Sequence, residues 1–160
     1  MPPLEPQDHI FMQAALAEAR KAREMAEVPV GAIVVDPAGK IIGRGCNRPI
    51  ASHDPTAHAE IVALRDAAQT LGNYRLPGCV MYVTIEPCIM CLGAVLQARI
   101  RRLVFGAADP KGGACVSLYR LPEDERLNHR LEVVGGIAEA DCRRLLQDFF
   151  RQRRKAFESD

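Results

Sequence analysis

The sequence lacks the features of a membrane or secreted protein. No apolar run approaches the ~20 residues that a helix needs to cross a bilayer. The beginning of the chain, MPPLEPQDHI, has neither the basic start nor the apolar stretch of a secretory signal peptide. We therefore expect a cytoplasmic protein that makes no contact with a membrane.

Low-complexity tracts, linker-like stretches and internal repeats are also absent. The 160 residues are 48 % hydrophobic and 26 % charged, which is typical of a soluble globular domain. A chain of this length buries roughly 70 % of its unfolded surface, so we predict one domain over residues 1–160. The net charge of +1 identifies no partner, but RQRRK, residues 151–155, gathers four cations in five residues.

Helical and strand-like patterns alternate along the chain. Helices are expected at residues 9–27, 54–71, 87–98 and 138–155, the second beginning at the capping pair Asp54 and Pro55. Strands are expected at residues 31–36, 40–45, 79–85, 102–106 and 131–135, and the first two form a hairpin. This order predicts an α/β protein with three layers, in which a central mixed five-stranded sheet lies between helices.

Apolar residues at helical spacing predict which helix faces are buried. The first helix should bury Ile10, Ala14, Ala17 and Met25, and the last should bury Leu145, Leu146, Phe149 and Phe150. The helix at residues 88–98 carries Met90, Leu92, Val95 and Leu96, more apolar surface than one short helix needs for its own sheet. That excess favours a homodimer, although burial within the monomer explains the same pattern.

Six cysteines occur, and a cytosolic chain of this size uses cysteine more often for metals or catalysis than for disulfides. Cys88 and Cys91 form a Cys-x-x-Cys pair in EPCIMC, residues 86–91, and His58 lies upstream in HAE, residues 58–60. One imidazole and two thiolates suit Zn²⁺ and leave the fourth tetrahedral position open for water. We therefore predict that His58, Cys88 and Cys91 bind one zinc ion per subunit.

The position of this pair at a helix start supports the prediction. Residues three apart face the same side of a helix, and the positive end of the helix dipole favours thiolate over thiol. Glu60 lies two residues from His58, so a regular helix places it poorly for sharing the metal. Its long side chain could still reach a metal-bound water, which makes Glu60 the candidate general acid and base.

Other uses of these residues stay open at this point. Cys-x-x-Cys also occurs as a redox pair, although no thioredoxin-like aromatic context surrounds it here. A structural zinc site would recruit a fourth ligand, for which Cys46 and Cys79 are candidates. His53 is a further possible ligand, but a role in shaping its loop is simpler. Cys115 and Cys142 are most simply packing residues.

HAE and PCIMC together resemble the His-x-Glu and Pro-Cys-x-x-Cys signature of zinc nucleobase deaminases. Within that superfamily the chain is most similar to the bacterial tRNA-specific adenosine deaminases. The similar segments cover nearly the whole chain: VPVGAIVVD (28–36), NRPIASHDPTAHAEI (47–61), NYRL (73–76), MYVTIEPCIMCLGA (81–94), RI (99–100), VFGAADPKGGA (104–114), NHR (128–130) and FFRQRR (149–154). The chain departs from the family pattern at Cys46 and at Val116.

The resemblance implies a cytidine-deaminase-like fold and conversion of the wobble adenosine of a tRNA anticodon, usually in an arginine tRNA, to inosine. It also implies a homodimer that binds the anticodon loop near the subunit boundary. By position, His58, Cys88 and Cys91 correspond to the zinc ligands and Glu60 to the proton shuttle. Other implied contacts are Asn47 with the base, and Asp109 and Lys111 with the RNA backbone.

Zinc lowers the pKa of bound water towards ~7. Glu60 would take the proton, hydroxide would attack C6 of adenine, and Glu60 would then protonate the ring and the leaving ammonia. The backbone N–H groups of Ala59 and Cys88, at helix starts, are candidate partners for the base or for the zinc-bound oxygen. Pro87 is a further candidate substrate-binding residue. A base in a loop is extruded into a pocket at less cost than one in a duplex.

The cations of the last helix are predicted to bind tRNA phosphates through Arg151, Arg153 and Arg154; a solvated helix end is the simpler alternative. Two rival functions remain. A deaminase of a free base or nucleoside (cytosine, cytidine or guanine) has no need of the basic segment RQRRK. A non-catalytic, zinc-stabilised RNA-binding module has no use for Glu60 beside the metal.

Overall fold

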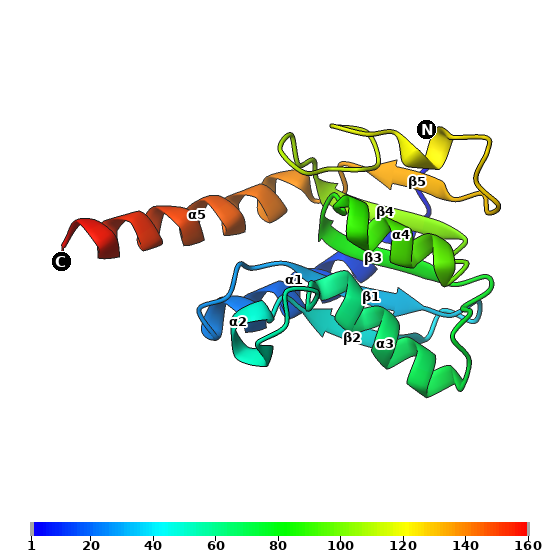
Figure 1. The fold of residues 1–160 in the computed structure, drawn as a ribbon, viewed down its shortest axis with the longest axis horizontal. Coiled ribbons are helices and arrows are strands. Elements are labelled where there is room, and N and C mark those ends of the chain that lie inside the picture. Colours follow the sequence, from blue (N-terminus) through cyan, green and yellow to red (C-terminus); the bar gives the residue numbers. More distant parts are fainter. Residues whose placement is uncertain (1, 160) are drawn as a thin grey trace.

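A five-stranded mixed sheet forms the centre of the protein, which we describe over residues 2–159 from a computed structural model (Figure 1). Its strands lie in the order β2-β1-β3-β4-β5. β1 pairs antiparallel with β2 and with β3, whereas β3, β4 and β5 are parallel to one another. The strands are β1 (Gly31–Val35), β2 (Ile41–Cys46), β3 (Val80–Ile85), β4 (Arg102–Ala107) and β5 (Glu132–Gly135).

Helices cover both faces of this sheet. They are α1 (Asp8–Glu24), α2 (Pro49–Ser52), α3 (Ala59–Leu71), α4 (Ile89–Gln97) and α5 (Glu139–Glu158), with a 3₁₀ turn at Leu121–Glu123. One hydrophobic cluster joins the sheet to α3 and α4, and a second joins it to α1 and α5. Neighbouring β3 residues divide between the two clusters, with Met81 in the first and Tyr82 in the second. The expected three-layer α/β fold is confirmed.

Two details of the expected helices were wrong. The helix expected from Asp54 begins at Ala59, because the Asp54 carboxylate accepts hydrogen bonds from the backbone and hydroxyl of Thr56 and closes a separate turn. Ile10 in α1 and Met25, directly after it, are exposed at 70 % and 42 %. The buried stripe of α1 is instead Met12, Ala15, Leu16, Ala19 and Ala22. Within residues 2–159, no helix combines the length and the apolar character that crossing a membrane requires.

α3 lies unusually close to the edge strand β2. A Cβ atom at Gly43 or Gly45 would overlap the α3 backbone, and α3 presents Ala59, Ala63 and Ala67 to this strand. Glycine facing alanine lets the helix axis approach the sheet, so the first residues of α3 are held firmly against the core. His58 and Glu60 lie at this end of the helix.

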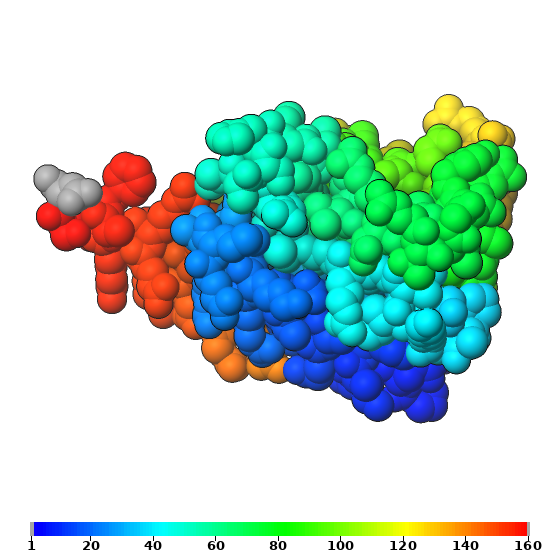
Figure 2. All heavy atoms as spheres, turned by 90° about the horizontal axis from the view of Figure 1, so that it is seen from below, coloured from blue at the N-terminus to red at the C-terminus, as the bar shows by residue number. Residues whose placement is uncertain are grey.

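The last helix leaves the body of the protein. Leu145 is buried in the cluster that joins the sheet to α1 and α5, and Phe149 is also buried, whereas residues 150–159 are exposed. Figure 1 and Figure 2 show these turns projecting beyond the other elements. The prediction that Leu146 and Phe150 share the buried face was therefore only half right: Leu146 is half-buried and Phe150 is 41 % exposed.

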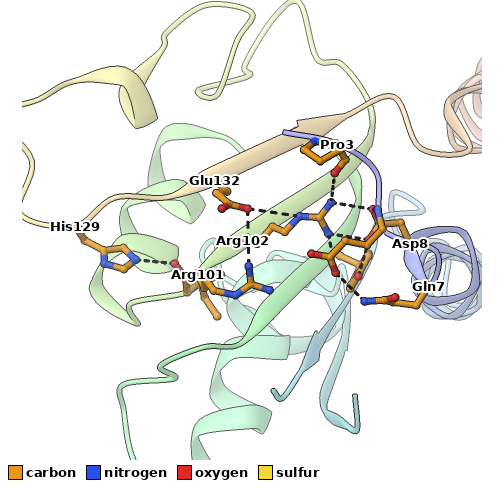
Figure 3. Close-up of polar contacts among 10 residues, drawn as sticks. Pro3, Gln7, Asp8, Arg101, Arg102, His129 and Glu132 are labelled. Carbon is orange, nitrogen blue, oxygen red and sulfur yellow. Dashed lines mark hydrogen bonds and ion pairs between the residues drawn. The ribbon is translucent and has the colours of Figure 1, made fainter. Parts of the chain in front are cut away.

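A buried ion pair ties the N-terminal segment to β4 (Figure 3). The Asp8 carboxylate accepts from Arg102 Nη1 at 2.7 Å and Nη2 at 2.9 Å, and from the Tyr82 hydroxyl at 2.8 Å. Asp8 and Arg102 are 0 % and 1 % exposed. Burial alone would raise the pKa of Asp8, but the hydrogen bonds from Arg102, Glu5 and Tyr82 outweigh it and hold this pKa below its ordinary value of 3.8.

Replacing Asp8 with asparagine should lower the free energy of unfolding by about 3–5 kcal/mol at neutral pH, because it removes the buried carboxylate that compensates the Arg102 guanidinium. Since folding lowers the pKa of Asp8, its contribution is present above about pH 4 and is lost as the pH falls through the folded value. The acid dependence of stability should therefore be shallower in Asp8→Asn than in the wild type. Urea unfolding at neutral pH and down to about pH 3 measures both effects.

Glu132→Gln is the matched control. Glu132 is half-exposed and lies 3.8 Å from Arg102, so its loss should change stability by no more than about 0.5–1 kcal/mol. Equal losses in the two variants would contradict the importance of the buried pair.

Candidate active site

The site is built where α3 and α4 begin side by side. His58 is the residue before α3 and Cys88 the residue before α4; both have extended backbones, with ψ of 153° and 174°. Cys91 follows in the first turn of α4 and is fully buried. Two helix N-termini therefore point their unpaired N–H groups at one place, where thiolate charge is stabilised.

His58, Cys88 and Cys91 lie together in the geometry of a metal site. Their ligand atoms are all within 4.8 Å of one another. His58 Nδ1 is 3.7 Å from Cys88 Sγ and 3.5 Å from Cys91 Sγ. Zn–S bonds of about 2.3 Å and Zn–N bonds of about 2.05 Å at a tetrahedral angle require about 3.6 Å between these atoms. The donor set thus fits Zn²⁺ in both chemistry and spacing.

A fourth protein ligand is missing from this group. Among residues 2–159, no other His, Cys, Asp or Glu joins it, and no second group of this kind occurs. Cys46 and Cys79, the candidates for a closed structural site, are buried elsewhere, and His53 is exposed at the end of α2. Three ligands and one open position are the arrangement of catalytic zinc sites.

The two thiols have different proton affinities. Hydrogen bonding from Cys91, and then from His58, lowers the pKa of Cys88 to about 3 even though burial opposes ionisation. The Cys88 partner and burial raise the pKa of Cys91. The His58 pKa is raised chiefly by its contact with Cys88. The Cys88 thiolate is therefore the most easily formed anion of the group.

Glu60 is the buried carboxylate of the same pocket. It is 3 % exposed, and burial raises its pKa above the ordinary value. The helical rule for residues two apart does not apply to His58 and Glu60, because His58 stands before the helix with an extended backbone. Both side chains consequently line one cavity, although Glu60 is outside the metal-ligand group.

That cavity has a volume of about 420 Å³, within the usual range for a small-molecule site. Of the residues singled out from the sequence, it brings together Asn47, His58, Glu60, Cys88, Asp109 and Lys111. The remaining lining consists of Val28, Val30, Ile85, Glu86, Leu146 and Phe150. A lining that combines apolar side chains with a few polar groups is suited to a flat heteroaromatic ring.

Two candidate contacts lie outside the lining of this cavity. Ala59 is fully buried as the first residue of α3, so its N–H has no acceptor within the helix. Pro87 is also buried, and its carbonyl accepts a hydrogen bond from the backbone of Ala114 at 2.9 Å. Pro87 thus contacts the loop that follows β4.

The predicted RNA-binding arginines divide between two surfaces. Arg151 and Arg154 line a cleft of about 580 Å³ that also contains Lys111 and Arg143; we term it the cationic cleft. Leu146 and Phe150 line both this cleft and the active-site cavity, so the two are contiguous. Arg153 instead lies over the Phe149 ring, 5.8 Å from its centre.

Comparison with known proteins identifies the class first. The model for the cytidine and deoxycytidylate deaminase zinc-binding region matches residues 5–107, and the chain belongs to that family. A tRNA-specific adenosine deaminase of Haemophilus influenzae is 50 % identical over 148 residues, covering 92 % of this chain and 86 % of the relative. One from Bacillus subtilis is 46 % identical over 93 % of this chain and 92 % of its own.

Because these relatives match more than 90 % of the chain, the chain also belongs to the narrower family of tRNA-specific adenosine deaminases. A solved structure from work on A-to-I editing by tRNA:A34 deaminases at the wobble position of transfer RNA agrees with this placement. It superimposes with a TM-score of 0.82 at 48 % identity and covers 86 % of this chain and 99 % of its own.

Proposed function

We propose that this protein hydrolyses adenosine to inosine at the wobble position of a tRNA anticodon, releasing ammonia, with an arginine tRNA as the first substrate to test. The observation that carries the proposal is the pairing of a three-ligand zinc site with the buried carboxylate of Glu60 in one cavity. Relatives at 46–50 % identity carry the tRNA-specific name.

His58, Cys88 and Cys91 would hold one zinc ion per subunit, and zinc in such sites supplies Lewis-acid activation of water. Glu60 would accept a proton from the attacking water and deliver it to the adenine ring; it would then take the proton of the C6 hydroxyl and pass it to the amino group, which departs as ammonia. The Asn47 amide faces the same cavity and would orient the base, and the N–H of Ala59 is available at the start of α3. The apolar side chains of the lining exclude bulk water from the ring.

RNA outside the cavity would be bound by the cationic cleft. Its cations Lys111, Arg143, Arg151 and Arg154 line a cleft contiguous with the cavity, where they could bind a phosphate backbone. Asp109 lies on the same loop as Lys111 and lines the cavity. A base extruded from an anticodon loop would then enter the cavity while its flanking phosphates stay in the cleft.

The decisive experiment incubates the protein with an anticodon stem-loop carrying a wobble adenosine and looks for inosine by nuclease digestion and mass spectrometry. Free adenosine, cytosine, cytidine and guanine are tested in parallel. Inosine from the stem-loop supports the proposal. Turnover of a free base alone would identify the protein as a nucleobase deaminase. RNA binding without turnover would identify it as a non-catalytic binding module.

The proposal also includes a single-domain enzyme, a cytoplasmic location and a homodimer. Leu92 and Val95 are fully buried within the monomer, so the face of α4 expected to mediate dimerisation is mostly used in the core. A shallow apolar groove between α3 and α4, with Ile61, Leu64, Tyr74, Ala94 and Ala98 in its lining, is the better candidate surface. Light scattering should give twice 17.6 kDa, and a monomer mass at micromolar concentration would contradict the dimer.

Changing Arg151, Arg153 and Arg154 together to alanine should weaken the binding of substrate and non-substrate tRNAs alike. Each lost phosphate contact should flatten the salt dependence of log K by about 0.7–0.9. Zinc content should stay unchanged. Arg126, which is exposed and paired with Asp124, provides the control Arg126→Ala. Fluorescence anisotropy over a salt series measures both the affinity and its salt dependence. An unchanged slope in the triple variant would indicate that these arginines belong to a solvated helix end and do not contact phosphates.

A further inference from the structure

Glu86 is a buried carboxylate beside the active site that has no part in the chemistry described above. It directly follows β3 and precedes Pro87 and Cys88. It is 1 % exposed and contributes to the lining of the active-site cavity. A buried charge requires compensation, so the partners of Glu86 indicate what it does.

Within residues 2–159, every hydrogen bond that this carboxylate accepts comes from one loop, residues 109–117. Oε2 accepts from three successive backbone N–H groups, those of Cys115 at 3.1 Å, Val116 at 2.9 Å and Ser117 at 3.0 Å. Oε1 accepts from the N–H of Asp109 at 3.1 Å and from the Ser117 hydroxyl. Successive N–H groups aimed at one anion form a strong cradle, and hydrogen bonds to an ionised acceptor are about twice as strong as neutral ones.

The loop is shaped to receive this carboxylate. A Cβ atom at Gly113 would overlap the Glu86 carboxyl group, so glycine is required there for the close approach. Further bonds close the loop on itself: the N–H of Gly113 donates to the Asp109 carbonyl at 2.9 Å, and the N–H of Lys111 donates to Asp109 Oδ1 at 3.1 Å. Val116 departs from the family pattern, but its φ is not positive, so a valine fits the loop backbone there without strain.

The two places where Glu86 holds the loop flank Lys111. Asp109 lies at one anchor, residues 115–117 form the other, and Lys111 lies between them on the wall shared by the cavity and the cationic cleft. An exposed lysine side chain is otherwise free to sample many positions. Fixing its backbone at both sides reduces the entropy that RNA binding would cost.

We propose that Glu86 is a positioning residue for the RNA substrate: it fixes the backbone of loop 109–117 and so holds Asp109 and Lys111 at the cavity entrance in position to bind the RNA. This inference rests on the proposed function, because it assigns the loop to RNA engagement. Glu86 acts through the loop and contacts neither the reacting base nor the attacking water.

Glu86→Gln tests the idea, because an amide keeps the shape but replaces one acceptor oxygen with a donor that faces backbone N–H groups. KM for the anticodon stem-loop should rise about 10- to 100-fold, as expected for losing a charge-assisted hydrogen bond. The kcat value should change less than about threefold, since Glu60 and the ligands are unaltered. Hydrogen exchange at the amides of residues 115–117 should accelerate. Glu24→Gln, at an exposed position of α1, controls for loss of one negative charge.

A double-mutant cycle separates positioning from general destabilisation. In a Lys111→Ala background, Glu86→Gln should add little to KM, because the side chain it positions is already gone. A merely structural role predicts additive losses together with lower metal content. Should Glu86→Gln fail to fold, Ser117→Ala removes only one of the five hydrogen bonds and should still raise KM by about 2- to 10-fold.

The outcomes distinguish this inference from the proposed function. If the wild type forms no inosine from the stem-loop, the proposed function fails. If the wild type is active but Glu86→Gln and Ser117→Ala keep wild-type KM while exchange accelerates, the loop is anchored by Glu86 without serving substrate. That result, or full additivity with Lys111→Ala, overturns the inference.

Discussion

Replacing Glu60 with glutamine should lower kcat for inosine formation by about 10²–10⁴-fold, the usual contribution of a general acid and base. Glutamine has nearly the same shape, so it should occupy the same buried position at the start of α3. An amide cannot take a proton from the attacking water or return one to the leaving ammonia. The affinity for the anticodon stem-loop should stay close to that of the wild type, because Glu60 is not among the residues that line the cationic cleft.

Metal analysis decides how this loss is interpreted. Glu60 is outside the group formed by His58, Cys88 and Cys91, so Glu60→Gln should keep the zinc content of the wild type. Loss of zinc from the variant would make Glu60 a ligand, and retained turnover would remove it from the proton transfer. Single-turnover kinetics with saturating enzyme should place the defect in the chemical step and not in binding.

Much of the fold could be predicted from the sequence because its local and tertiary signals agree. Strand β3 is a run of apolar and β-branched residues bounded by breakers, and burial on both faces follows from that pattern. The end of α3 was also correct: Leu71 is its last residue, and Gly72 follows with a φ of +70°. Such residues specify the backbone conformation at their own positions.

Where local signals compete, the sequence alone did not predict the start of α3 or the buried face of α1. Asp54 caps a turn as readily as a helix, and here it closes the turn at Thr56, so α3 begins only at Ala59, where it packs closely against Gly43 and Gly45. In α1, large apolar residues such as Ile10 suggested the wrong face. The sheet accepts a stripe rich in alanine because Gly31 lets the helix approach closely. These choices depend on residues distant in the chain.

In the active site, too, some residues could be predicted from the sequence and others could not. The ligand types and the Cys-x-x-Cys spacing predicted the group that the fold brings together across 30 residues of sequence. Leu146 and Phe150 were missed as cavity residues because helical periodicity assigned them to the core. Glu86 stands directly before Pro87 in the quoted motif, but nothing in the local sequence indicates that its partners lie 23 to 31 residues later.

Replacing Cys88 and Cys91 together with serine should abolish zinc binding and lower the melting temperature by about 10 °C or more. A metal bound at about 1,000 times its Kd contributes about 4 kcal/mol, and 1 kcal/mol corresponds to about 2–4 °C for a chain of this size. A metal bound by His58, Cys88 and Cys91 would join the starts of α3 and α4, which are otherwise held together by apolar contacts. Calorimetry and metal analysis measure the two effects.

Cys142→Ser is the matched control, because Cys142 is as buried as Cys91 but packs in the cluster on the opposite face of the sheet. It should lose some stability and keep its zinc. A strong chelator should bring the melting temperature of the wild type down to that of the double variant and leave the double variant unchanged, since both then lack the same metal. Retention of about one zinc per chain in the double variant would refute the assignment of the site, and a chelator effect on the double variant would point to a second metal site.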